Sequence, residues 1–183
     1  MKVHETTIAG ALILEPDVFA DARGFFLETY RDSRFVEAGI DVSFPQDNHS
    51  RSGAGVLRGL HYQITRPQGH LVTILTGAIF DVGLDLRRGS PSFGTVFTTE
   101  LHADGPRQIW LPPGVAHGFC VLGDGADIHY KCSDVYVPGD EAGVAWDDPD
   151  LAIDWPLDAP MVAAKDTAHP RLRDIPIERL PHA

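Results

Sequence analysis

The sequence predicts an all-β protein folded as a sandwich or barrel, and three observations support this fold class. Short segments rich in β-branched and aromatic residues recur along the chain, with turn residues between them. The 18 glycines and 14 prolines are spread out rather than clustered, which suits many short strands and turns. Only Ser33–Ala38 looks helical, with Asp32 or Ser33 as its cap and Gly39 as its stop. Many strands with scarcely any helix are typical of a sandwich or barrel.

The first apolar run, Ile8–Leu14, is predicted to be a strand. It is much shorter than the ~20 apolar residues that a membrane span needs. It also follows Glu5 and runs into Glu15-Pro16-Asp17, so it lacks the small-residue cleavage site of a secretory signal. The cytoplasm is therefore the expected location.

The clearest predicted strand is Ala78–Leu86. Its apolar residues alternate with Asp81, Gly83 and Asp85, so the two kinds of residue fall on opposite faces. A turn ends it, and the β-branched and aromatic segment Thr95–Leu101 is predicted to be the next strand.

A β-hairpin is predicted between Gly118 and Cys132. Its strands would be Gly118–Leu122 and Ala126–Cys132, joined by a turn at Gly123-Asp124-Gly125. The second strand places Tyr130 on the same face as three apolar residues, namely Ala126, Ile128 and Cys132. The Pro- and Asp-rich stretch from about Trp146 is expected to wrap the barrel as turns and a short helix.

Length and composition indicate one domain, 1–183, because domains average ~150 residues and a chain of this size can bury ~70% of its unfolded surface. The 26 acidic and 15 basic residues give a formal net charge of −11, which disfavours nucleic acid and acidic membranes as partners. An anionic ligand would need a local cluster of basic residues. Cys120 and Cys132 are too few for a disulfide framework and are expected to be inert small hydrophobes.

Two polar stretches inside apolar sequence are candidate functional segments. The first runs from Gln46 to Ser52 and continues in GVLRGLHYQ at 55–63. Arg58 and His61 lie an odd number of positions apart, so they need a bulge or twist to face one pocket. Gly59 between them makes that distortion easy. In the second stretch, His117 lies in a glycine-flanked turn after an aromatic strand.

These stretches resemble the dTDP-4-dehydrorhamnose 3,5-epimerase family. The matching segments occur in the family's order: DARGFF (21–26), QDNHSRS (46–52), GVLRGLHYQ (55–63), FDVGLDLRRGSPSFG (80–94), AHGF (116–119) and IDWP (153–156). The resemblance runs from about Leu12 to Asp166. It implies a jelly-roll (cupin-like) homodimer that works without a metal or nucleotide cofactor. It also implies a dTDP-4-keto-6-deoxy-hexose substrate that is inverted at C3 and C5.

The resemblance further implies an acid–base pair. C3 and C5 both neighbour the C4 ketone, so loss of either proton gives an enolate, and inversion needs a base on one face and an acid on the other. The resemblance assigns the base to His61, its orienting carboxylate to Asp166 and the acid to Tyr130. A carboxylate behind an imidazole fixes its tautomer and favours the imidazolium.

A second set of matched positions is implied to bind the nucleotide-linked sugar: Arg23, Glu28, Gln46, Asp47, Asn48, Arg58, His70, His117, Tyr136, Glu141 and Lys165. Arginine forks can hold a pyrophosphate bidentately even in an acidic protein, and Tyr136 matches the aromatic residue that stacks on thymine. His70 stands where the family has a lysine, so a fixed positive charge is lost. In the family, some of these contacts come from the neighbouring subunit.

Three other interpretations were compared with this one. A metal-dependent cupin needs two histidines one residue apart, and no His-x-His occurs here, so no metal site is expected. A single-centre epimerase of another nucleotide-linked 4-keto sugar stays open because of His70. A jelly roll that only binds a sugar nucleotide is disfavoured, because binding does not require an acid–base pair. The histidines expected at the surface are His102, His129, His169 and His182.

Overall fold

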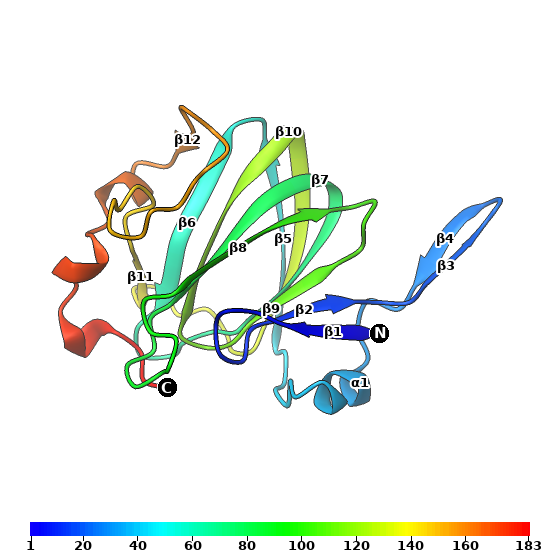
Figure 1. Ribbon diagram of the computed structural model, residues 1–183, viewed down its shortest axis with the longest axis horizontal. Coiled ribbons are helices and arrows are strands. Elements are labelled where there is room, and N and C mark those ends of the chain that lie inside the picture. Colours follow the sequence, from blue (N-terminus) through cyan, green and yellow to red (C-terminus); the bar gives the residue numbers. More distant parts are fainter.

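The computed structural model describes residues 1–183 as a curved ten-stranded sheet, a separate two-stranded hairpin and a C-terminal segment of turns (Figure 1). The strands are β1 (Lys2–Glu5), β2 (Leu12–Glu15), β3 (Val18–Asp21), β4 (Gly24–Leu27), β5 (Gln46–Gly53), β6 (Val56–Gln63), β7 (His70–Asp85), β8 (Val96–His102), β9 (Gln108–Leu111), β10 (Val115–Cys132), β11 (Glu141–Gly143) and β12 (Met161–Val162). The helices are α1 (Asp32–Glu37) and the 3₁₀ turns η1 (Asp166–Ala168), η2 (Leu172–Asp174) and η3 (Ile177–Arg179). The predicted all-β class is confirmed, and α1 lies within one residue of the predicted helix.

Two long strands, β7 and β10, belong to both layers of the barrel. They are antiparallel from Val115 opposite Asp85 to Cys132 opposite His70. One half of this pair is flanked by β9 and β5, and the other half by β8 and β6. β1 and β2 extend the first layer, whereas β11 and β12 extend the second. Because the long strands cross from one layer to the other, the layers enclose an interior, as a jelly roll requires.

The predicted hairpin at 118–132 is wrong: this segment is the single strand β10. Leu122 pairs with Ala78 and Ala126 pairs with Gly77, so residues 123–125 bulge out between consecutive pairs without reversing the chain. Gly77 makes the bulge possible, because a Cβ there would lie 1.9 Å from the carbonyl oxygen of Gly125. The Asp-Gly sequence thus bends one strand from layer to layer instead of joining two strands.

The other predicted strands agree in part. Ala78–Leu86 forms the second half of the longer β7, and Thr95–Leu101 corresponds to β8 with a shift of one residue. The predicted strand Ile8–Leu14 begins only at Leu12. The residues before it form a tight turn in which the Ala11 N–H donates to the Ile8 carbonyl at 3.0 Å. Ile8 is 1% exposed there, so it is apolar because it fills the core rather than because it extends a strand.

The core has three apolar clusters: one between the layers, one beneath the C-terminal segment, residues 146–183, and a smaller one that includes Phe35 of α1 and Trp110 of β9. Val82 and Leu84 of β7 pack against Ile175 and Leu180 of that segment. The opposite face of β7 points into the barrel, since Gly83 lies against Ile8, Leu111 and Val115 of the inner cluster. Asp81 and Asp85 are therefore buried rather than solvated. The C-terminal segment wraps this layer (Figure 1) with three 3₁₀ turns in place of the expected short helix.

The β3–β4 hairpin extends away from the barrel as an arm (Figure 1). Its aromatic side chains Phe19, Phe25 and Phe26 are 65%, 64% and 69% exposed. An isolated two-stranded hairpin is at best marginally stable in water, so this arm is a candidate for contact with another chain. No helix in the structure is both long enough and apolar enough to span a bilayer.

Replacing Gly59 by alanine is expected to lower the free energy of unfolding by about 3 kcal/mol, measured by urea unfolding. Its φ is +129°, and an added Cβ would lie 2.5 Å from the Cα of Gly118 on β10. Gly123→Ala is the matched control: its φ is +76° but no atom lies within 4 Å of the added Cβ. We expect about 1 kcal/mol for the control, and equal losses in the two variants would contradict the role of close strand contact.

Candidate active site

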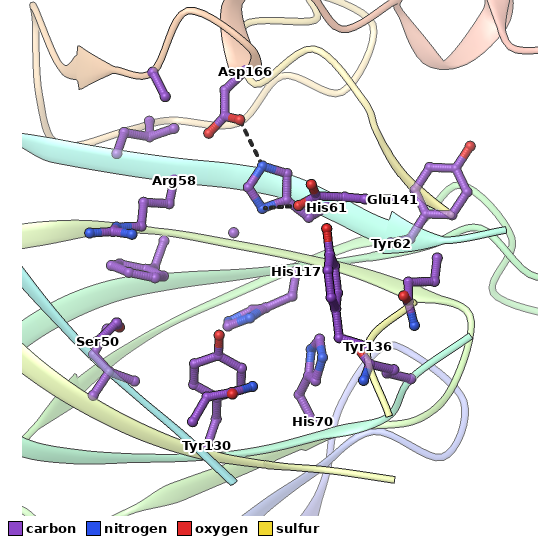
Figure 2. Close-up of a pocket in the computed structure, with 18 of the residues that line it drawn as sticks. Ser50, Arg58, His61, Tyr62, His70, His117, Tyr130, Tyr136, Glu141 and Asp166 are labelled. Atoms are coloured by element: carbon purple, nitrogen blue, oxygen red, sulfur yellow. Dashed lines mark hydrogen bonds and ion pairs between the residues drawn. The ribbon is translucent and has the colours of Figure 1, made fainter. Parts of the chain in front are cut away.

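A cavity of about 720 Å³ opens into the barrel and is lined from several strands and the C-terminal segment (Figure 2). Most of the predicted site residues line it, although they are spread over the chain: Gln46, Asn48, Arg58, His61, His70, His117, Tyr130, Tyr136, Glu141, Lys165 and Asp166. Their number and polarity distinguish this hollow from the apolar core beside it.

A bulge in β6 turns both Arg58 and His61 toward the cavity. His61 pairs with His117 and Arg58 pairs with Phe119, so β6 has one residue more than β10 between these pairs. The extra residue changes the side-chain alternation, which otherwise would point Arg58 and His61 to opposite faces. The predicted distortion at Gly59 is therefore confirmed.

His61 and Asp166 form a hydrogen-bonded pair at the edge of the cavity (Figure 2). The distance from His61 Nε2 to Asp166 Oδ1 is 2.8 Å, and the Asp166 side chain is only 1% exposed. The backbone N–H of Gly59 donates to the other carboxylate oxygen at 3.3 Å. Because an ionised carboxylate only accepts, Nε2 of His61 carries the hydrogen and Nδ1 keeps its lone pair. This arrangement leaves Nδ1 able to act as a base.

The free nitrogen of His61 is on the side of Glu141. His61 Nδ1 lies 3.9 Å from Glu141 Oε1, and Lys165 Nζ donates to both oxygens of that carboxylate at 3.0 Å. The lysine balances the carboxylate, so the base is not flanked by an unpaired negative charge. A second ion pair thus accompanies the His61–Asp166 pair at the cavity edge.

Tyr130 approaches the cavity from the other side. Figure 2 shows its hydroxyl directed into the space between β10 and His61. Burial raises the pKa of Tyr130, so the phenol keeps its proton at neutral pH. The cavity therefore has a proton acceptor on one side and a proton donor on the other.

His117 is held by the carboxylate of Asp81, a residue that was not among the predicted site residues. Its Nε2 lies 2.7 Å from Oδ2 of Asp81, which is 0% exposed. The other oxygen of Asp81 is buried without a hydrogen-bond partner. The sequence contained one signal for Asp81: it lies on the polar face of the predicted strand Ala78–Leu86, and this face points into the barrel. The barrel interior therefore contains a second histidine–carboxylate pair.

His70 is an uncharged residue between Tyr130 and His117. Its ring centroid lies 5.6 Å from that of Tyr130 and 5.8 Å from that of His117. Burial, together with the neighbouring His117 and His61, lowers the pKa of His70 to about 3. The imidazole is therefore neutral at physiological pH, in agreement with the predicted loss of a fixed charge. Its Nδ1 is buried and has no hydrogen-bond partner.

Acidification is expected to destabilise the protein through His70. In the unfolded chain His70 binds a proton below its ordinary pKa of ~6.5, whereas in the folded protein it binds one only near pH 3. Because the unfolded state binds more protons, the free energy of unfolding falls as the pH falls through this range. Lowering the pH from 7 to 5 should cost about 2 kcal/mol through this group. Urea unfolding at both pH values should show this loss in the wild type and not in His70→Gln. The same pH dependence in both proteins would contradict the prediction.

Three predicted site residues do not line the cavity, namely Arg23, Glu28 and Asp47. Arg23 lies on the β3–β4 arm, where it pairs with Asp21. Glu28 follows the arm and pairs with Arg31 at 2.8 Å. Within one chain, neither residue reaches the cavity, and both remain predictions that involve a second subunit.

Asp47 does not line the cavity either, and its contact with the substrate stays a prediction. Gln46 and Asn48 line the cavity, so strand alternation turns Asp47 to the other face of β5. There it accepts a hydrogen bond from Lys131 Nζ at 2.7 Å. The matched segment is continuous in sequence, but only alternate residues of a strand share a face.

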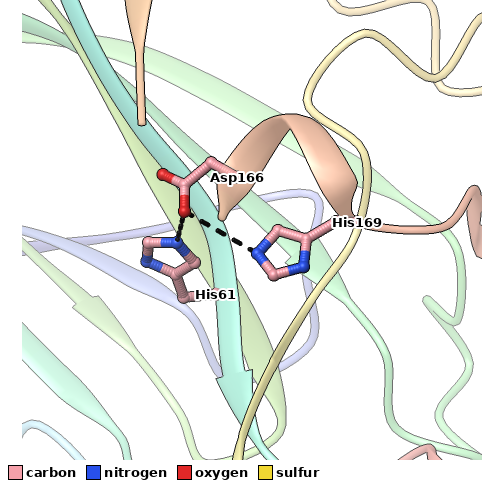
Figure 3. A group of neighbouring side chains, drawn as sticks. All are labelled: His61, Asp166 and His169. Carbon is pink, nitrogen blue, oxygen red and sulfur yellow. Dashed lines mark hydrogen bonds and ion pairs between the residues drawn. The ribbon is translucent and has the colours of Figure 1, made fainter. Parts of the chain in front are cut away.

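His169 is a correction, because it was expected at the surface. Its side chain is 17% exposed, and its Nε2 lies 3.7 Å from Asp166 Oδ1 (Figure 3). The ring meets that of His61 edge-on at 5.7 Å between centroids. A Cβ added to Gly143 would lie 2.4 Å from the His169 ring, so the missing side chain of this glycine leaves room for the ring. Nothing in its local sequence signals this position, which depends on the turn η1.

The sequence of this chain matches proteins of a known family. A sequence profile described as dTDP-4-dehydrorhamnose 3,5-epimerase matches residues 5–174. The chain belongs to the dTDP-4-dehydrorhamnose 3,5-epimerase family. Membership confirms the resemblance that was found in the sequence.

Members of the dTDP-4-dehydrorhamnose 3,5-epimerase family match nearly the whole chain. The one from Pseudomonas aeruginosa is 52% identical over 168 residues, which cover 91% of this chain and 93% of the relative. The one from Neisseria gonorrhoeae is 49% identical over 92% of this chain, which spans only 52% of that relative's length.

A solved structure agrees with the fold. The crystal structure of dTDP-6-deoxy-D-glucose-3,5-epimerase from Legionella pneumophila, in complex with dTDP-4-keto-L-rhamnose, has a TM-score of 0.96 and 46% sequence identity. The match covers 100% of this chain and 98% of that one. The predicted jelly-roll (cupin-like) fold is thus confirmed.

Proposed function

We propose that the protein is a dTDP-4-dehydrorhamnose 3,5-epimerase that inverts C3 and C5 of a dTDP-linked 4-keto-6-deoxy-hexose. The observation that carries the proposal is the His61–Asp166 pair on one side of the cavity with the Tyr130 hydroxyl on the other. Inversion next to a ketone requires this opposition of base and acid. Membership of an epimerase family supplies the substrate class.

The reaction proceeds in two proton transfers at each carbon. His61 Nδ1 takes the proton next to the C4 ketone, and the electron pair of the broken C–H bond moves into the enolate. Asp166 stabilises the imidazolium that forms. Tyr130 then donates its proton to the opposite face of the carbon, which inverts the centre. Exchange with water returns a proton to Tyr130 and removes one from His61.

The nucleotide part is assigned to the cavity mouth. Arg58 is exposed there and is oriented by hydrogen bonds to Ser52 Oγ at 3.0 Å and the Arg51 carbonyl at 3.2 Å. A guanidinium held in this way can bind a diphosphate bidentately. Tyr136 is 45% exposed at the mouth, and its face is available for stacking on the base. These two residues give an acidic protein a local site for an anionic nucleotide.

A homodimer is proposed as the active form. Three exposed phenylalanines lie on the β3–β4 arm, which also carries Arg23. An interface that covers the arm would bury apolar surface and bring Arg23 to the cavity of the second subunit. We also assign the enzyme to the cytoplasm, and the free thiols of Cys120 and Cys132 suit a reducing compartment.

The proposed activity is tested by incubation with dTDP-4-keto-6-deoxy-glucose in deuterated water, followed by mass spectrometry. Uptake of two deuterons into the sugar supports the 3,5-epimerase. Uptake of one points to a single-centre epimerase, in which neutral His70 does not replace the family's lysine. Uptake of none, with binding retained, means that the site binds the sugar nucleotide without chemistry.

The dimer is tested by mixing two inactive variants, Arg23→Ala and His61→Ala. If Arg23 acts across the interface, a mixed dimer has one site with both defects and one intact site. Random reassortment should then restore about a quarter of the wild-type activity, because half of the dimers are mixed. No recovery in dimers that have exchanged subunits would mean that Arg23 does not serve the partner's site.

A further inference from the structure

Behind the base, on the side of His61 away from its free nitrogen, three potential metal ligands converge (Figure 3). The ligating atoms of His61, Asp166 and His169 all lie within 4.8 Å of one another. Asp166 is 1% exposed and His169 is 17% exposed, so the group is largely shielded from water. His169 Nε2 is buried, faces Asp166 and has no hydrogen-bond partner. This nitrogen has a lone pair or proton that the fold leaves unused.

We propose that His61, Asp166 and His169 form a Zn²⁺ site, and that a bound ion switches off the base. Two imidazoles and one carboxylate are a ligand set that zinc accepts, with water in the fourth position. The site lies at the edge of the substrate cavity, because His61 and Asp166 line the cavity and His169 behind them does not. The inhibitory effect rests on the proposed function, whereas the binding of the ion does not.

The distances suit a tetrahedral ion. Zinc binds nitrogen and oxygen at ~2.0–2.1 Å, so two ligands of a tetrahedral ion lie roughly 3.3 Å apart. The two separations to Asp166 Oδ1 are 2.8 Å from His61 Nε2 and 3.7 Å from His169 Nε2, on either side of this value. Small rotations of the two rings would equalise them. The ion replaces the hydrogen bond between His61 Nε2 and Asp166 Oδ1, and it gives His169 Nε2 a partner.

Metal binding reverses the tautomer of His61. The ion needs the Nε2 lone pair, so the hydrogen on Nε2 moves through solvent to Nδ1 and the neutral ring keeps one proton in total. Nδ1 then has no lone pair directed at the substrate and cannot take its proton. The cavity itself is unchanged, so substrate still binds. Zinc is therefore expected to lower kcat and to leave KM unchanged.

The test compares the wild type with His169→Phe, which keeps an aromatic ring against Gly143 and removes the ligand atom. Chelator-treated protein is titrated with ZnCl₂ by calorimetry, and deuterium uptake is assayed at each zinc concentration. The wild type should bind one ion that His169→Phe binds much more weakly. The zinc concentration that halves activity should rise at least ~10–100-fold in the variant, because the loss of a direct ligand costs no less than the loss of a group that supports a ligand. His102→Phe, at an exposed site, is the matched control and should behave as the wild type.

Equal zinc sensitivity in wild type and His169→Phe would overturn the proposal, as would inhibition that competes with substrate. Competition would place the ion inside the cavity, beside His70 or His117. Calorimetry is read without substrate, so an inactive protein that binds zinc through His169 would refute the epimerase proposal alone. If His169→Phe fails to fold, His169→Gln provides the same comparison, because the amide is a poor zinc ligand.

Discussion

His61→Ala is expected to abolish exchange of the sugar's C3 and C5 protons with deuterated water. The variant loses the base and leaves Asp166 without its hydrogen-bond donor at 2.8 Å. General acid–base catalysis contributes ~10²–10⁴-fold, and here no carbanion chemistry can begin without the base, so we expect a loss at the upper end of that range or beyond. Mass spectrometry of the sugar measures it directly.

The nucleotide should still bind to His61→Ala within a few-fold of the wild-type affinity. Arg58 and Tyr136 are assigned to the nucleotide, and neither contacts the His61 ring through a hydrogen bond. Calorimetric titration with dTDP separates this expectation from misfolding. Asp166→Asn is the companion variant: it keeps the shape of the side chain, removes the charge that favours the imidazolium and should also slow exchange. Substantial exchange in His61→Ala would mean that another group is the base.

Tyr130→Phe should uncouple proton exchange from inversion. His61 can still remove a proton and return a deuteron to the same face, so label enters the sugar while its configuration is retained. Delivery to the opposite face loses its donor, and net epimerisation is expected to fall ~10²–10⁴-fold. Mass spectrometry measures the label, and NMR of the sugar measures its configuration.

The matched control for Tyr130→Phe is Tyr62→Phe. Tyr62 also lines the cavity, but its hydroxyl points away from the His61–Asp166 pair (Figure 2). It should keep the wild-type ratio of inversion to exchange. If Tyr130→Phe inverts the sugar as well as Tyr62→Phe does, the proton comes from another donor in the cavity.

Local sequence patterns predicted the fold class better than the course of individual strands. Alternation found the second half of β7, and capping residues found α1. The pattern around Gly123-Asp124-Gly125 was misleading because a bulge and a hairpin turn use the same residues. What separates them is the partner strand, here Gly77 of β7, and no local pattern contains that information.

The site was predictable only where a family motif reached it. His61 and Asp166 are 105 positions apart, and no spacing rule brings them together. Asp81 and His169 lie outside the residues to which the resemblance assigned a role, so neither was predicted as part of the site. Both owe their positions to tertiary packing: Asp81 to the inward face of β7, and His169 to the backbone of Gly143.

The pairing of β12 with β6 has a consequence for biosynthesis. Met161 and Val162 lie beside Val56 and Leu57, and this contact brings Asp166 from the last tenth of the chain behind a histidine in its first third. During translation the barrel strands leave the ribosome well before Asp166 does. Until the tail docks, His61 lacks the carboxylate that accepts its Nε2 hydrogen and orients its ring. The site is therefore incomplete until the end of the chain has been made, and the enzyme becomes competent only as synthesis ends.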